Sequence, residues 1–141
     1  MTNAVRAYRL RLLASLLVVT PIGFASKLYQ GPGAWWLNDY GGGVLYEIFW
    51  ILLAAWVVPH ARSFWLGTSV FLVTSVLEFL QLWHPRFLET LRSTFLGQTL
   101  LGTTFVWWDF PHYVLGCALG AWWVHYLGRR WKPGQAHAEV P

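Results

Sequence analysis

Charged residues are scarce in this sequence. Asp, Glu, Lys and Arg together make up 11% of its 141 residues, whereas 56% are hydrophobic and 18% are aromatic. Soluble domains carry roughly 25% charged residues, so the composition excludes an ordinary soluble domain. The length is that of about one domain. We therefore expect an all-α integral membrane protein.

Cysteine is nearly absent as well. The single Cys117 lies inside an apolar run, which excludes an internal disulfide and a cysteine metal cluster. The HExxH, GxSxG and phosphate-loop motifs are also missing. Glu78, His84, Asp109 and His112 carry metal-binding groups, but their spacing matches no common metal site. We predict no metal, no cofactor and no catalytic residue, and we expect Cys117 to pack between helices.

Long apolar runs dominate instead. A helix that crosses the hydrocarbon core needs about 20 mostly apolar residues, and four runs qualify. They cover residues 10–29, 43–58, 64–83 and 110–127. Pro21 is expected to kink the first helix. The prediction is a bundle of four transmembrane helices in a domain over residues 1–128, followed by a flexible cytoplasmic tail over residues 129–141.

Basic residues are unevenly distributed between the ends of these runs. Four spans put both termini on one side together with seven basic residues, and leave three on the other side. The positive-inside rule therefore places both termini in the cytoplasm of a bacterial inner membrane. The first run also imitates a signal peptide because three arginines precede it, and we interpret it as a retained span. Since the cations cluster beside apolar runs, we expect a lipid bilayer and no nucleic acid as partner.

The segment between the third and fourth runs is too apolar for an external loop and too charged for another span. One helical face there is apolar and the opposite face is polar. The first has Phe87, Leu88, Leu91 and Phe95, and the second has Glu89, Arg92 and Ser93. We expect a short amphipathic helix in the membrane interface, then a return with hinges at Gly97 and Gly102. A re-entrant hairpin is the alternative.

Polar residues recur at helical spacing inside the predicted spans. In the third span, Glu78 and Gln81 are three residues apart, which places them on one face. Glu47 lies about one turn inside the outer end of the second span, and Asp109 and His112 open the fourth. Acids inside a membrane are costly and indicate a functional site. We therefore predict a polar cluster in the outer leaflet.

Arg92 is the expected counter-charge of this cluster, because a guanidinium can bind a carboxylate through two hydrogen bonds. Glu78, Gln81, Arg92 and Asp109 form its predicted core, with Glu47 and His112 beside it. A structural clasp is the favoured role, ahead of a lipid headgroup site and of acid–base catalysis. In the fourth span, Gly116 and Gly120 form a GxxxG motif that predicts close helix packing.

The pattern WWLNDYGGGVLYEIFW (35–50), followed by EFLQLWHPRFLETLRSTFLGQTLLGTTFVWWDF (78–110), resembles the DUF2809 family of small bacterial membrane proteins of unknown function. The resemblance extends over about residues 29–120. More distantly, the chain resembles the VanZ-like family associated with teicoplanin resistance. That family has a Glu-x-x-Gln, Arg and Asp series, which matches Glu78, Gln81, Arg92 and Asp109. The VanZ-like family usually has Asn four residues after its Asp, and this chain has Tyr113 at that position. Neither resemblance implies a settled activity.

Three functions fit these features. The first is the binding of a lipid or cell-envelope precursor at the polar cluster. The second is an accessory or scaffold subunit, in which a partner membrane protein or a second copy covers the excess tryptophan; Trp50, Trp56, Trp122 and Trp123 lie within spans. The third, an enzyme or proton-coupled transporter, is disfavoured because four short helices without an internal repeat leave little room for alternating access.

Overall fold

The computed structural model describes residues 3–129, and every regular element there is helical. Six helices follow one another, since α2, a π-helical turn (η1) and α3 form one continuous run. The elements are α1 Asn3–Ser26, α2 Ala34–Trp36, η1 Leu37–Gly41, α3 Gly42–Val57, α4 Ser63–Leu80, α5 Arg86–Arg92, α6 Phe95–Leu101 and α7 Asp109–Arg129. The predicted all-α class is confirmed. Except for Arg129, the tail predicted over residues 129–141 lies outside the described residues.

Within the described residues, three helices are long and apolar enough to cross a membrane. They are α1, the continuous run Ala34–Val57 and α4. These match the first three predicted spans, and α1 continues through Pro21. The fourth predicted span coincides with α7, which has 21 residues but carries Asp109 and His112 in its first turn. Its crossing of a membrane stays a prediction.

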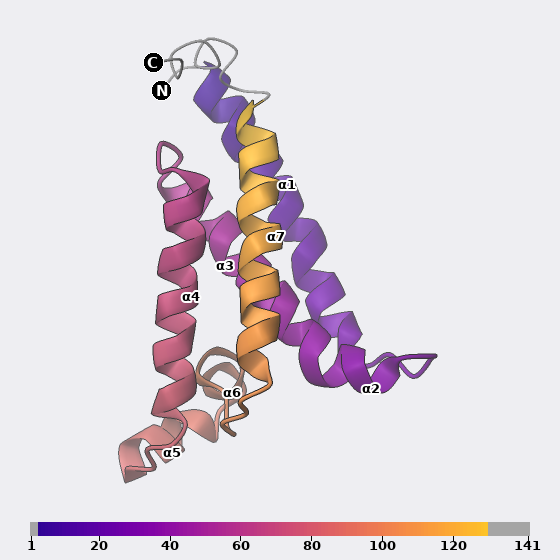
Figure 1. Ribbon diagram of the computed structural model, residues 1–141, viewed down its shortest axis with the longest axis vertical. Helices are drawn as coiled ribbons and strands as arrows, with labels where there is room; N and C mark the ends of the chain where they lie inside the picture. Colours follow the sequence, from indigo (N-terminus) through magenta and orange to yellow (C-terminus); the bar gives the residue numbers. More distant parts are fainter. Residues whose placement is uncertain (1–2, 130–141) are drawn as a thin grey trace.

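α3 lies at the centre of the bundle and packs against α1, α4 and α7. The core between these helices is aliphatic, and Leu12, Ile51 and Leu52 are fully buried in it. The start of α1 and the end of α7 lie together at one end of the molecule, while α2, α5 and α6 lie at the other (Figure 1). We call this second end the α6 end.

The segment between α4 and α7 corrects the sequence-based prediction. It forms two short helices, α5 and α6, instead of one helix followed by two hinges. Gly97 lies inside α6, so tightly against a backbone carbonyl of α5 that a Cβ would overlap it. Gly102 does end α6, with φ of 67°. The predicted apolar and polar faces do not correspond to the buried and exposed sides of this segment. Phe87 and Phe95 of the apolar face are exposed, whereas Arg92 of the polar face is buried.

Candidate functional site

A cavity of about 930 Å³ opens between α1, α3 and α4 and is bounded by α6 and the start of α7. Its walls within the spans are mostly apolar. They include Val19 from α1, Leu45 and Phe49 from α3, and Leu77 from α4. Two contacts hold α6 against the spans: the rings of Phe24 and Phe95 stack with centroids 6.2 Å apart, and Tyr46 donates a hydrogen bond to the carbonyl of Leu100 at 2.9 Å. The cavity is thereby bounded at the α6 end.

The charged and amide side chains of the cavity gather at this α6 end, whereas the hydroxyls of Thr20 and Thr74 along the spans donate to carbonyls of their own helices. The charged and amide side chains come from the last turns of α1 and α4, from η1, from α6 and from the first turn of α7. They include Lys27, Asp39, Glu78, Gln81, Gln98 and Asp109. The cavity is therefore apolar along the spans and polar at one end.

Glu78 is the most fully hydrogen-bonded acid at this end. Its side chain is 1% exposed. Oε2 accepts hydrogen bonds from Gln81 Nε2 at 2.8 Å and from the Tyr113 hydroxyl at 2.9 Å, and Oε1 accepts one from the backbone N–H of Val106 at 2.9 Å. Three neutral donors thus satisfy a buried carboxylate that has no ion pair with a cation from residues 3–129. Glu78 fastens α4 to α7 and to the loop that precedes α7.

Gln81 is held by Glu78 on one side only. Its Nε2 donates to Glu78, whereas its Oε1 is buried and accepts no hydrogen bond. The residue is 6% exposed and lines the cavity. A buried amide oxygen without a donor is costly. Gln81 Oε1 is therefore an acceptor available to a group that enters the cavity.

Arg92 does not have the carboxylate partner that the sequence predicted. It is 6% exposed, and its two terminal nitrogens donate to the carbonyls of Leu80, at 2.8 Å, and Trp83, at 3.0 Å. The last carbonyls of a helix have no partner within the helix, and they carry its partial negative charge. Arg92 thus caps the end of α4 and draws α5 against it.

The other two predicted acids lie in different surroundings. Asp109 is half-buried, lines the cavity and is within electrostatic reach of Glu78, His112 and Lys27, but its carboxylate accepts no hydrogen bond from residues 3–129. Glu47 is fully buried between α3 and α7, where it accepts a hydrogen bond from Cys117 Sγ at 3.0 Å. The structure therefore brings Gln81 and Asp109 to the cavity beside Glu78 and leaves Glu47 behind it.

Comparison with known proteins identifies the family. A family model described as "Protein of unknown function (DUF2809)" matches residues 33–117, more than half of the chain. The chain belongs to the DUF2809 family. This confirms the family inferred from the sequence motifs, and the DUF2809 segment contains every acid of the predicted cluster. No solved structure matches the chain.

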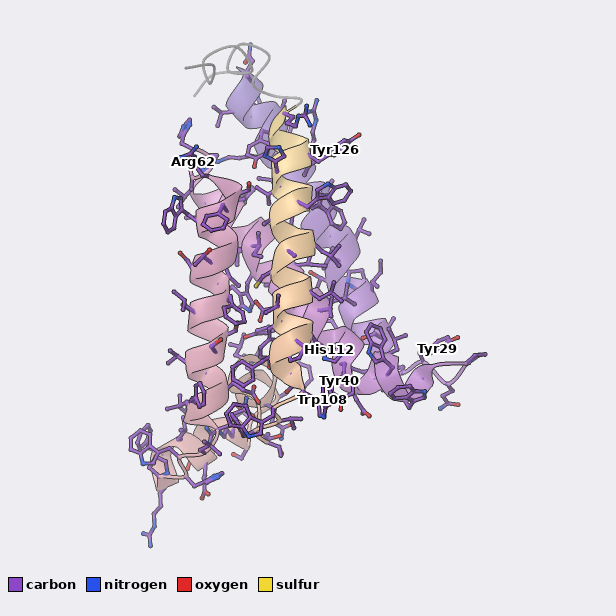
Figure 2. All side chains as sticks on the ribbon, viewed as in Figure 1. Tyr29, Tyr40, Arg62, Trp108, His112 and Tyr126 are labelled. Carbon is purple, nitrogen blue, oxygen red and sulfur yellow. The ribbon has the colours of Figure 1, made fainter. Side chains whose placement is uncertain are left out.

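His112 of the DUF2809 segment is held by aromatic residues. Its Nδ1 lies 2.7 Å from the carbonyl of Trp108 and so carries the proton that it donates, while Nε2 accepts a hydrogen bond from Trp36 Nε1 at 3.1 Å. Its ring stacks on Tyr40 with centroids 4.4 Å apart. Figure 2 shows this group where η1 meets the start of α7. With both nitrogens engaged, His112 fastens the second helical run to α7, and it does not line the cavity.

The two glycines of the predicted packing motif face α3. A Cβ on Gly116 would lie 2.7 Å from both the Glu47 Cβ and the Val44 carbonyl oxygen. A Cβ on Gly120 would lie 2.9 Å from the Ile51 side chain. Both glycines are buried. Within the DUF2809 segment, the missing side chain of Gly116 thus lets α7 lie against the backbone of α3.

Three side chains of the site escaped the sequence analysis. Lys27 and Asp39 line the cavity but are not among the predicted site residues. Tyr113 had been noted as a departure from the VanZ-like pattern, yet its hydroxyl is a main donor to Glu78. Tyr113 does have a local signal, because it lies one turn after Asp109 on α7. Lys27 and Asp39 have none, since no periodicity connects them to α4.

Replacing Gly102 with alanine is expected to lower the free energy of unfolding by about 2 kcal/mol. Gly102 has φ of 67° and ψ of 174°, a region open essentially to glycine alone and costing other residues about 1–3 kcal/mol. Its new Cβ would also lie 2.5 Å from Gln81 Nε2. Thermal unfolding of the detergent-solubilised protein measures the loss.

Gly33→Ala is the matched control for this substitution. Gly33 also has a positive φ, of 76°, but a Cβ there would meet nothing within 4 Å. A left-handed conformation alone costs about 1–2 kcal/mol, so the control should lose less stability. Equal losses in the two variants would show that the contact between Gly102 and Gln81 contributes nothing.

Proposed function

We propose that this protein spans the bacterial inner membrane four times and binds an amphiphile, a lipid or a cell-envelope precursor, in the cavity at the α6 end. α7 is the fourth span, because 21 helical residues extend about 30 Å, the thickness of the hydrocarbon core. Both termini are cytoplasmic, and the α6 end faces outward. The proposal assigns no reaction to the protein.

The observation that carries this proposal is the division of one cavity into apolar walls and a polar end. An amphiphile has the same division, with chains that avoid water and a head that needs hydrogen bonds. The polar end lies at the helix ends, where the membrane interface would be, and Trp83, Trp107 and Trp108 lie exposed there, as in an interfacial aromatic belt. Acyl chains would then follow the spans while the head occupies the polar end.

The cavity is large enough for a headgroup and the adjoining part of its chains. Pockets for molecules of a few hundred daltons measure about 300–1,000 Å³, and this one measures about 930 Å³. Its lining also includes Gln81, whose buried Oε1 has no donor, and Asp109, whose carboxylate accepts no hydrogen bond from residues 3–129. Binding would supply donors that the protein does not supply itself.

Replacing Gly23 with phenylalanine is expected to fill the cavity and reduce co-purified amphiphile at least about tenfold without unfolding the protein. Gly23 lines the cavity, and the nearest atom to a Cβ there is the Leu45 Cβ at 4.0 Å, an ordinary contact. Replacing glycine within a helix also favours the helix, while losing apolar contact area weakens binding by more than one power of ten. Mass spectrometry of the natively purified protein measures the amphiphile.

Gly128→Phe is the control. It makes the same exchange within α7, at a position where a Cβ meets nothing within 4 Å and which does not line the cavity. Amphiphile retained by Gly128→Phe and lost by Gly23→Phe would support the proposal. Equal amphiphile in the wild type and both variants would refute binding in this cavity.

A second candidate is an accessory subunit whose partner covers α4. Of the apolar stretch of α4, 17% is buried inside the protein, whereas 39% of the corresponding stretch in the run Ala34–Val57 is buried. Phe64, Trp65, Leu72 and Val76 are exposed on it. The same native mass spectra decide between the two, because a stoichiometric second chain without amphiphile would favour the accessory role.

A further inference from the structure

We infer that the amphiphile is a zwitterionic phospholipid with a primary amine, of the phosphatidylethanolamine type, whose ammonium binds Gln81 and Asp109 and whose phosphate binds Lys27. The inference rests on the proposed function and specifies the headgroup of the same site. It follows from the charges and the unused hydrogen-bonding groups at the polar end of the cavity.

The charges at this end favour a cationic group. Among the described residues that line the cavity, Asp39, Glu78 and Asp109 carry carboxylates, whereas Lys27 is the one cationic side chain. The oxygens of Glu78 already accept three hydrogen bonds. Asp109, in contrast, accepts none from residues 3–129 and has Glu78 in electrostatic reach. A cation beside Asp109 would offset both negative charges.

The cation must also donate hydrogen bonds. Gln81 lines the cavity, and its Oε1 is buried without a donor from the described residues. Gln81 donates a hydrogen bond to Glu78, and Asp109 interacts electrostatically with the same carboxyl group. A primary ammonium has three N–H donors, enough for both acceptors. A trimethylammonium has none and would leave Gln81 Oε1 unpartnered.

Lys27 supplies the complementary group for a phosphate. Its Nζ donates one hydrogen bond, to the carbonyl of Asn38, and retains two donors. It extends over Gly42 at the start of α3, where a Cβ would lie 2.8 Å from Lys27 Cε. Lys27 is also in electrostatic reach of Asp109. A phosphate and an ammonium joined by two carbons suit one lysine and one aspartate better than a head with net negative charge does.

The test measures binding of three lipids with identical chains to the full-length protein in a neutral detergent, by native mass spectrometry. The lipids carry ethanolamine, choline and glycerol heads. We expect the ethanolamine lipid to bind at least about tenfold more tightly than the other two, because an unpaired buried acceptor or an uncompensated charge costs that much or more. Equal binding of the three, or tightest binding of the glycerol lipid, would overturn the inference.

Two variants test the ammonium and the phosphate of the headgroup separately. Asp109→Asn should reduce the preference for ethanolamine over glycerol to less than about threefold, because it removes the negative charge that favours a head with a cation. Lys27→Met should weaken both lipids by a similar factor, about tenfold for a lost charged hydrogen bond, and keep their ratio. Glu89→Gln is the control, because Glu89 lies at the same end but outside the cavity, 3.7 Å from His84. An unchanged preference in Asp109→Asn would overturn the assignment of the ammonium.

A second measurement needs no variant. Adding one, two and then three methyl groups to the ethanolamine nitrogen leaves it two, one and no N–H donors, and affinity for the wild-type protein should fall mainly at the second and third steps, when fewer donors than the two acceptors remain. A flat series would refute the headgroup inference. If every head bound equally and Gly23→Phe abolished all binding, the proposed function would stand without this inference. If no amphiphile bound at all, both would fail.

Discussion

Replacing Glu78 with alanine is expected to lower the free energy of unfolding by about 2–4 kcal/mol. The change removes the acceptor of three hydrogen bonds, from Gln81, Tyr113 and the Val106 N–H. Hydrogen bonds between membrane helices contribute about 0.6–1.7 kcal/mol each, and buried donors left without a partner add to the loss. Reversible unfolding in mixed micelles, followed by tryptophan fluorescence, measures it.

Glu89→Ala is the matched control for that experiment. Glu89 is exposed on α5, and its carboxylate lies 3.7 Å from His84 Nδ1. Exposed pairs of this kind contribute at most about 1 kcal/mol. Equal stability of the Glu78 variant and the wild type would show that Glu78 does not fasten α4 to α7, and its hydrogen bonds would need another explanation.

Replacing Gly116 with leucine should lower the free energy of unfolding by about 3 kcal/mol, an effect comparable to that of Glu78→Ala. The first added carbon would already lie 2.7 Å from the Val44 carbonyl oxygen, which belongs to the backbone and cannot rotate away. Inserting side-chain atoms into a packed interior costs about 1–3 kcal/mol and occasionally more. The same unfolding assay applies, and a shift of α7 away from α3 should also expose Cys117, which is buried, to a maleimide reagent.

Gly128→Leu is the control for this variant. It tests whether the loss of stability depends on the position of the leucine in α7 or on any glycine-to-leucine exchange there. A Cβ at Gly128 meets nothing within 4 Å, so this variant should unfold like the wild type and keep Cys117 unreactive. If Gly116→Leu were as stable as Gly128→Leu, the contact between α7 and α3 at Gly116 would not be a close one.

The polar cluster combines two roles that the sequence analysis had treated as alternatives. Glu78 has the contacts of a structural clasp, because both its oxygens are occupied by donors from the protein. Gln81 joins the two roles, since its nitrogen donates to Glu78 while the residue lines the cavity with an oxygen that has no donor among the described residues. Asp109 belongs to the cavity side. In the proposed function, the clasp holds the acceptors of the ligand in place.

Local patterns in the sequence predicted much of this arrangement. The spacing of Glu78 and Gln81 placed both on one face of α4, and both are buried there. The four apolar runs matched α1, α3, α4 and α7 within a few residues, apart from an earlier start of α1. These predictions succeed because hydropathy and helical periodicity depend on residues close in the chain.

The partners of the polar groups could not be predicted in this way. Arg92 was expected to bind a carboxylate, but α5 folds back so that its guanidinium meets the end of α4 first. The donors to Glu78 from Val106 and Tyr113 lie 28 and 35 residues away in the chain. Which groups meet at such separations depends on how the helices cross and where the loop between them turns.

The sequence by itself determined the class of this protein: all-α, with apolar helices long enough to cross a membrane and the DUF2809 motifs between them. Only the tertiary structure decided which acids are hydrogen-bonded within the protein, and that a cavity joins Lys27 to Gln81 and Asp109. The physical reason is that burial in lipid follows from composition, whereas a binding site requires groups from several helices at distances of a few ångströms.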